Sequence, residues 1–109
     1  ERVIVYANSQ QYNRPSNVMM ATGAVRVKYS NYIADGPKAI MYINSSTNQP
    51  DKIVFLGRSK IVEKGANSVE ADKITIVMKP KTFEAVGKVK TVIEQTSPDR
   101  DEDEMEFSL

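Results

Sequence analysis

Three glycines inside strand-like segments constrain the fold of this chain more than any other feature. Gly23, Gly57 and Gly87 are spaced by 34 and 30 residues, within the range typical of internal repeats. Around each glycine, apolar residues recur at every second position, which is the period of a strand with one dry face. Because glycine lets a strand bend where a side chain would clash, each glycine is predicted to mark a corner in a long strand.

Residues 22–42 are the most complete copy of this pattern. In that copy, the apolar residues Val25 and Val27 alternate with the basic residues Arg26 and Lys28. Basic residues recur after the other two glycines, as Arg58, Lys60, Lys88 and Lys90. Repeats of paired strands that each bend at a corner stack into an elongated structure. We expect the apolar face of these strands to lie inside and the basic face outside.

A second element, Ala-Asp followed by a strand, recurs between the glycines. Its two copies are Ala34-Asp35 before Ile40 and Tyr42, and Ala71-Asp72 before Ile74 and Ile76. The first copy also contains Gly36-Pro37, which predicts a bulge or a turn. Each aspartate is expected to cap a turn through its side chain. No acid or base recurs beside it, so we do not expect it to be catalytic.

The rest of the chain is predicted to consist of strands and turns. Residues 7–16 are polar and predict a loop, and residues 44–51 predict a surface loop that joins the two strands of a long hairpin. Residues 73–79 are short and rich in β-branched side chains, which favours a strand over a helix. Since no segment has a helical period, the fold class is predicted to be all-β.

Composition excludes several kinds of site. The chain has no Cys and no His, so thiol nucleophiles, imidazole bases, disulfides and the usual zinc sites are excluded. We expect no catalytic residue, cofactor or metal. The formal net charge is +1, which gives no case for a nucleic-acid partner. No stretch approaches the 18 apolar residues of a membrane-spanning helix.

Charge divides the chain into two parts. Residues 1–98 carry 14 basic and 8 acidic residues, a net charge of +6, whereas six acids lie within residues 99–109. We therefore predict one folded domain over residues 1–95 and an acidic, disordered tail over residues 96–109. The chain begins on a glutamate rather than Met, and we expect it to be a mature or excised segment of a longer protein.

The recurring motifs resemble the LptA/OstA family of lipopolysaccharide-transport proteins. The features that carry this resemblance are GAVRV at 23–27, IAD at 33–35, VEADKIT at 69–75 and GKVKTVI at 87–93. The similarity covers roughly residues 3–95. The motifs are short, so their order and repetition carry the specificity.

The resemblance implies a fold, a ligand and a compartment. The fold would be an OstA-like β-jellyroll shaped like a taco, with repeated antiparallel strands. Its apolar groove would hold the acyl chains of lipid A, and such domains would stack end to end into a bridge across the periplasm toward the outer membrane. Residues 3–6 and 88–93 are the strand edges expected to pair with further jellyroll domains or other copies of the chain.

The apolar side chains of the predicted inner face are the candidate groove residues. They are Met19, Val25, Val27, Tyr29, Ile40, Tyr42, Ile53, Phe55, Ile61, Ile74, Ile76, Met78, Phe83, Val89 and Ile93. Residue types alone do not distinguish a lipid groove from a packed core. The alternative is therefore a structural module with a dry core that acts only through its edge strands. Four basic residues would contact lipid phosphates if they lie at the groove rim, and a solvated basic face is the alternative for them: Arg26, Lys28, Lys88 and Lys90.

Overall fold

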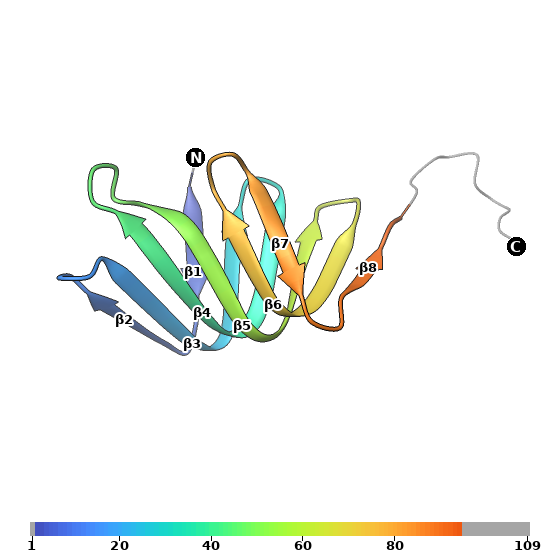
Figure 1. The fold of residues 1–109 in the computed structure, drawn as a ribbon, viewed down its shortest axis with the longest axis horizontal. Coiled ribbons are helices and arrows are strands. Elements are labelled where there is room, and N and C mark those ends of the chain that lie inside the picture. Colours follow the sequence, from blue (N-terminus) through green and yellow to red (C-terminus); the bar gives the residue numbers. More distant parts are fainter. Residues whose placement is uncertain (1, 95–109) are drawn as a thin grey trace, which may run out of the picture.

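One antiparallel sheet accounts for the whole described structure (Figure 1). The computed structural model describes residues 2–94. The strands are β1 (Val3–Tyr6), β2 (Ser9–Asn13), β3 (Val18–Tyr29), β4 (Tyr32–Asn44), β5 (Gln49–Glu63), β6 (Ser68–Val77), β7 (Thr82–Val86) and β8 (Lys90–Val92). The predicted all-β fold class is confirmed. Residues 2–94 contain no helix that is long and apolar enough to cross a membrane.

The four long strands, β3 to β6, bend in the middle and fold the sheet into a V (Figure 1). On one side of the bends the strand order is β1-β3-β4-β5-β6-β8, and we call this half the β1/β8 arm. On the other side the order is β2-β3-β4-β5-β6-β7, and we call it the β2/β7 arm. The sheet does not close into a barrel, which agrees with the predicted taco-like fold.

Glycines lie at the bends, as the repeat predicts. Gly23, Gly57 and Gly87 have φ angles of 82°, 90° and 88°, a region that side chains rarely adopt. The sheet register shifts beside the first two. A neighbouring side chain fills the space that a Cβ would occupy at each glycine, within 2.6 Å for Asn8 at Gly23, 2.6 Å for Pro37 at Gly57 and 2.8 Å for Asp72 at Gly87. The corners therefore need glycine for both conformation and space.

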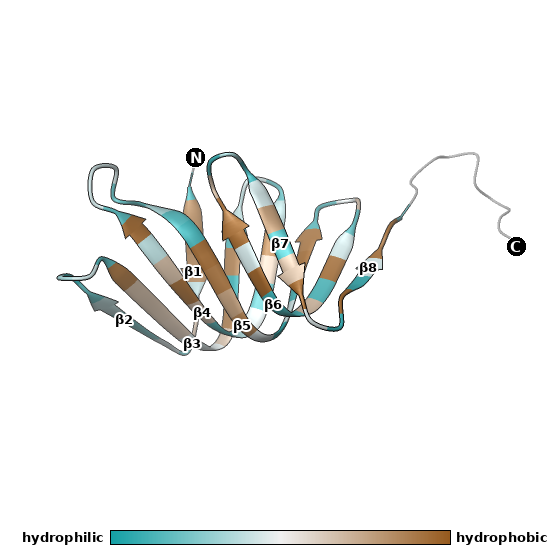
Figure 2. Cartoon of the chain, viewed as in Figure 1, coloured by the Kyte–Doolittle hydropathy of each residue, from teal (hydrophilic) through white to brown (hydrophobic). Residues whose placement is uncertain are grey.

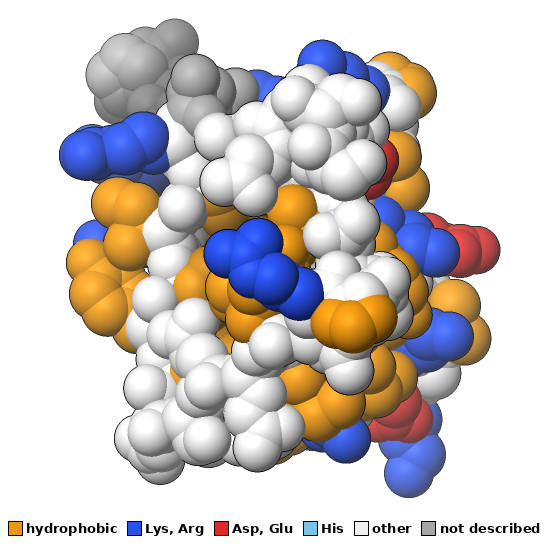
Figure 3. Space-filling view, turned by 90° about the vertical axis from the view of Figure 1, so that its left-hand side faces the viewer, with side chains coloured by type: hydrophobic (Ala, Val, Ile, Leu, Met, Phe, Trp, Pro, Cys, Tyr) orange, Lys and Arg blue, Asp and Glu red, His pale blue; other side chains and the backbone are white. Residues whose placement is uncertain are grey.

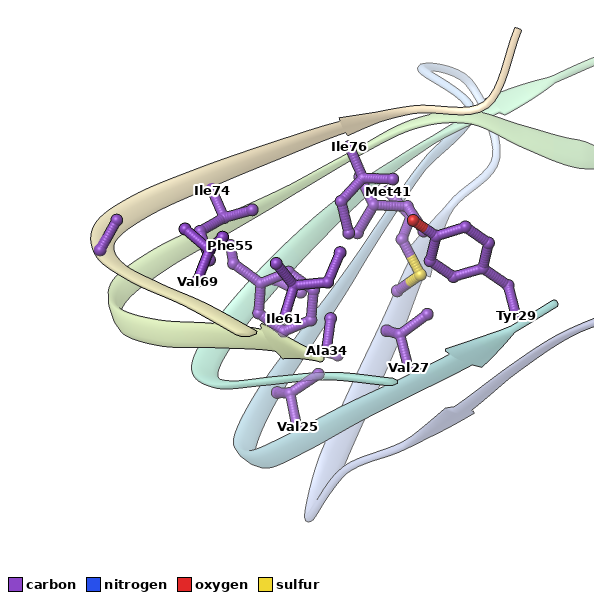
Figure 4. Packing of buried hydrophobic residues seen from close by; sticks show 14 residues of the cluster. Val25, Val27, Tyr29, Ala34, Met41, Phe55, Ile61, Val69, Ile74 and Ile76 are labelled. Atoms are coloured by element: carbon purple, nitrogen blue, oxygen red, sulfur yellow. The ribbon is translucent and has the colours of Figure 1, made fainter. Parts of the chain in front are cut away.

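The hydrophobic core lies between the two arms. Figure 2 shows hydrophobic and hydrophilic bands alternating along the long strands, and the hydrophobic positions point into the V. Phe55, Ile53 and Ile76 are 0% exposed, and Met41 is 1% exposed. Figure 4 shows Phe55, Met41 and Ile76 packing against Val27, Ala34 and Ile61 from the opposite arm. Burial of one face of each arm against the other is the driving force that holds the V together.

The prediction of a loop over residues 7–16 is wrong for the middle of that range, whereas residues 14–16 do form part of a turn. Residues 9–13 form β2, which pairs with β3 from Ser9↔Thr22 to Asn13↔Val18. All five residues of β2 are exposed, so the strand has no apolar face and its sequence shows no period-two pattern. Residues 7–8 make the corner between β1 and β2, where the Asn8 backbone N–H donates to the Gly23 carbonyl at 2.9 Å.

Candidate functional site

The space between the arms is an apolar trough, and most of the predicted groove residues lie along it. Eight of them have exposed fractions of 3% or less: Val25, Val27, Tyr29, Ile53, Phe55, Ile61, Ile74 and Ile76. Met19 and Met78 are half-buried and pack against this cluster. Over most of its length, therefore, the trough is filled by the protein's own side chains.

The trough opens at the end formed by β7 and β8. A cavity of about 240 Å³ lies there, lined by Tyr32, Ile61, Val69, Phe83, Thr91 and Ile93, together with Glu63 and Asn67. Phe83 comes from the β2/β7 arm and is 39% exposed, whereas Ile93 follows β8 and is 72% exposed. We call this cavity the β7/β8 mouth. Large apolar side chains exposed at a concave opening are typical of a binding site.

Val89 is not part of this mouth. It lies between β7 and β8, where the chain turns the corner after Gly87, and it is 49% exposed. Gly87 and Lys88 both have positive φ angles, 88° and 48°. The regular alternation that placed Val89 among the groove residues therefore breaks at this corner.

The assignment of Ile40 and Tyr42 to the inner face is wrong. Ala39 and Met41 face the trough instead, with exposed fractions of 0% and 1%. Tyr42 is 39% exposed, and Lys52 Nζ lies 4.7 Å from the centre of its ring on the outer face. A lipid groove in this fold cannot be lined by the side chains of Ile40 and Tyr42.

The physical reason is the corner that β4 turns after Gly36. Ala34 is buried in the trough, and a Cβ on Gly36 would meet the side chains of Phe55 and Ser59 there. At this corner β5 has one residue more than β4 between the pairs Asp35↔Lys60 and Lys38↔Leu56, and the next inward residue of β4 is Ala39, three positions after Gly36 rather than two. Such a shift moves every later side chain to the opposite face.

Several inner residues were not singled out by sequence reasoning. Tyr32 stacks on Tyr29 with ring centroids 5.3 Å apart, and Val69 lines the mouth. Val69 stands three positions before Asp72, at the start of a strand whose alternation is interrupted by a corner. Tyr32 could have been found from its neighbour, because residues 29 and 32 flank a two-residue turn and are paired across it.

The basic residues that follow Gly23 lie on the outer face of the V and contact other side chains there. Arg26 Nε donates to Asp35 Oδ1 at 2.7 Å, and this hydrogen bond, with the charge of Asp35, raises the pKa of Arg26 above its usual value. Lys28 Nζ lies 5.8 Å from the centre of the Tyr6 ring. Neither is at the trough rim, which favours the solvated basic face over phosphate contacts by these residues.

Asp35 and Asp72 are cross-strand partners rather than turn caps. Asp35 pairs with Arg26 of the neighbouring strand, and Asp72 accepts a hydrogen bond from Arg58 Nη1 at 3.2 Å. On the outer face the sheet register places Arg26, Asp35, Lys60, Glu70 and Lys90 in one row across five strands. Opposite charges on neighbouring strands stabilise such a row modestly.

Arg58 fixes the corner between β7 and β8, which precedes the mouth residues Thr91 and Ile93. Its Nη1 donates to the carbonyl of Lys88 at 2.8 Å and to that of Gly87 at 3.4 Å, besides Asp72. Its Nη2 lies 3.8 Å from Glu70 Oε1. One guanidinium therefore joins β5, β6 and the turn between β7 and β8. It holds the start of β8 close to β6, the strand with which β8 pairs.

Replacing Arg58 by alanine is expected to loosen this corner. Because the guanidinium is half exposed, we expect the free energy of unfolding to fall by only about 1 kcal/mol. Amide hydrogen exchange of residues 87–92 should nevertheless accelerate clearly, since two carbonyl contacts are lost there. Arg26→Ala is the matched control, because it removes an outer-face ion pair that does not touch this corner. Equal acceleration at residues 87–92 in both variants would contradict this role of Arg58.

Among residues 2–94, no three or more Asp or Glu side chains are grouped so that they could hold a metal ion. The chemistry that the described site offers is apolar contact in the trough and at its mouth. The charged pairs described above lie on the outer face of the sheet, away from the trough.

The chain was compared with family models, curated proteins and solved structures, and similarity is found among solved structures. No protein-family model matches the chain, and no curated protein matches it. A solved structure that is similar is the crystal structure of LptH, the LptA homologous periplasmic component of the conserved lipopolysaccharide transport device from Pseudomonas aeruginosa. The similarity covers 87% of this chain and 96% of that one, with 14% sequence identity and a TM-score of 0.44. An identity of 14% and a TM-score of 0.44 are too low for that structure to indicate the function of this chain.

Proposed function

We propose that this chain is a lipopolysaccharide-transport module of the periplasm that binds the acyl chains of lipid A in the trough between its arms. The observation that carries the proposal is the β7/β8 mouth, where an otherwise packed apolar interior opens to solvent between Phe83 and Ile93. The resemblance of the repeated motifs to the LptA/OstA family supplies the ligand class. A carrier needs an apolar interior with an open side, and the V has both.

Acyl chains enter the trough at the mouth and extend inward as the arms separate. The mouth alone, at about 240 Å³, is smaller than the roughly 300–1,000 Å³ of typical ligand pockets. The two arms meet through apolar side chains, while the strand pairing runs within each arm. Because side-chain contacts between arms can be replaced by contacts with lipid, the arms can open without loss of sheet hydrogen bonds.

Stacking into a bridge uses the open ends of the V. β1 and β2 form one end, and β7 and β8 form the other. The backbone groups at such edges are available to pair with a strand of another chain. We propose that the β7/β8 end of one unit pairs with the β1/β2 end of the next, either in another copy of this chain or in another jellyroll domain. The apolar trough would then continue from unit to unit.

Lipid extraction tests the proposed ligand. The protein is purified from a host that makes lipopolysaccharide, and bound lipid is identified by mass spectrometry. We expect lipid A species to be enriched over phospholipids that are abundant in the same host. Recovery of no lipid, or of phospholipid in proportion to its abundance, would contradict the proposal.

A structural module with a dry core is the second candidate, and the tight packing of Phe55, Met41 and Ile76 favours it. Such a module would associate through its edges without carrying lipid. Sedimentation at increasing protein concentration, with and without added lipopolysaccharide, separates the two functions. The transport module is expected to associate and to carry lipid in the sedimenting species, whereas the structural module would associate identically in both conditions.

A further inference from the structure

A second cavity, of about 230 Å³, lies where three separate segments meet. The segments are the start of β1, the β4–β5 turn and the β6–β7 turn, which lie on the same side of the molecule in Figure 1. Its lining includes Val3, Pro50, Asp51, Met78, Lys79 and Lys81. We call it the rim cavity.

The rim cavity has an apolar base and a cationic lip. Val3 and Met78 line it and also pack against the hydrophobic core between the arms. Lys79 and Lys81 flank Pro80 in the β6–β7 turn, so both ammonium groups belong to one short segment above this base. An apolar base beside two ammonium groups suits a ligand that is apolar at one end and anionic at the other.

The charge at this cavity is positive on balance. Asp51 is the acidic side chain of its lining, against the two lysines Lys79 and Lys81, and its Oδ2 accepts a hydrogen bond from Asn44 Nδ2 at 3.1 Å. Lys79 has no hydrogen-bond or ion-pair partner among residues 2–94. At the β7/β8 mouth, in contrast, the charged side chain of the lining is Glu63. An anionic group is therefore attracted to the rim cavity rather than to the mouth.

The two cavities are close enough for one ligand to reach both. Val3 of the rim cavity is paired with Tyr29, which is paired with Tyr32 of the mouth. Two strand spacings separate Val3 from Tyr32, a distance of about 10 Å. Tyr29 stands between these two residues in the sheet, and its ring stacks on that of Tyr32. Figure 4 shows the Tyr29 ring turned toward Met41 and Ile76.

From this arrangement we infer that Lys79 and Lys81 bind a phosphate group of an amphiphile whose acyl chain lies in the trough. The inference rests on the proposed function, because it assigns the headgroup of the same ligand. Phosphate oxygens accept charge-assisted hydrogen bonds from ammonium groups. The lysines would orient the ligand so that its chain points along the tyrosine pair toward the mouth.

Binding of two lipids that differ only in phosphate tests this assignment. Lipid A and its enzymatically dephosphorylated form, with the same acyl chains, are titrated in detergent micelles against the full chain and against the double variant Lys79→Ala/Lys81→Ala. We expect the double variant to bind lipid A about tenfold more weakly, with unchanged binding of the dephosphorylated lipid. Lys79→Arg/Lys81→Arg should retain most of the binding, because the positive charge remains.

The matched control is Lys60→Ala/Lys73→Ala, which removes the same two charges from exposed positions of β5 and β6 outside the rim cavity. An equal loss in this control, or equal loss for both lipids, would overturn the assignment and leave the proposed function standing. If the wild-type chain binds neither lipid, the proposed function and the inference both fail.

Glucosamine 1-phosphate distinguishes a lipid headgroup from a free sugar phosphate. Amide chemical shifts of residues 78–81 are followed while this compound is added to the wild-type chain. We expect glucosamine 1-phosphate to bind much more weakly than lipid A. The Lys79→Ala/Lys81→Ala variant should abolish this weak binding. Binding of the sugar phosphate as tight as that of lipid A would overturn the role of the acyl chain and identify the rim as a site for a free phosphate compound.

Discussion

Replacing Phe55 by alanine is expected to lower the free energy of unfolding by about 3–5 kcal/mol. Phe55 is 0% exposed and lies among Gly36, Ser59 and the apolar side chains between the arms. Truncation removes its apolar contacts and leaves a cavity that the bent strands cannot close without changing their register. Denaturant unfolding followed by circular dichroism measures the change.

Phe83→Ala is the matched control for this prediction. It is the same substitution at a residue that is 39% exposed at the β7/β8 mouth. Since part of its ring is already in water, we expect a loss of about 1 kcal/mol. Comparable losses for the two variants would contradict the distinction between a packed trough and an open mouth.

Replacing Gly57 by alanine is expected to cost about 3 kcal/mol, because two effects add at this corner. Its φ of 90° lies where a Cβ is strained, which costs about 1–2 kcal/mol. A Cβ would also lie 2.6 Å from Cγ of Pro37, and a proline ring cannot rotate away, so the bend itself must shift at a further cost of about 1–3 kcal/mol.

Gly65→Ala separates the two effects. Gly65 also has a positive φ, 74°, but nothing lies within 4 Å of a Cβ placed there. We therefore expect only the conformational cost, about 1 kcal/mol. Thermal unfolding of both variants measures the difference, and an equal shift of the midpoint would show that the contact with Pro37 does not constrain the corner.

Local periodicity was sufficient to predict the corners and most of the inner face. Gly23, Gly57 and Gly87 each stand where the apolar alternation continues on both sides, and only a residue with no side chain fits the bend. The alternation around Ile53 and Phe55 is regular, so those residues were placed correctly. The sequence pattern therefore predicts those features that depend on one strand and its nearest turn, such as the corners and the inward residues between them.

Features that depend on how strands meet could not be predicted. At the corner after Gly36 the step between inward positions of β4 is three residues rather than two, and the sequence of a single strand does not reveal which positions face inward after such a corner. The sequence pattern therefore predicts that Ile40 and Tyr42 face inward, whereas Ala39 and Met41 do so in the structure. β2 was missed because an exposed edge strand needs no apolar face.

The rim cavity depends on still longer range contacts. Lys79 and Lys81 belong to an ordinary polar turn by sequence, and nothing near them indicates a site. They become candidates because the start of β1, more than 70 positions earlier in the chain, lines the same cavity. The orientation of the basic residues after the glycines, in contrast, followed directly from alternation.

Site-specific photo-crosslinking in cells that make lipopolysaccharide tests the central claim most directly. The crosslinker is placed at Ile93 in the mouth, at Ile76 inside the trough and at Tyr42 on the outer face of β4. If the trough carries acyl chains, Ile93 and Ile76 will be labelled with lipid and Tyr42 will be labelled much less. Equal labelling at the three positions, or labelling at none, would contradict a lipid-carrying trough.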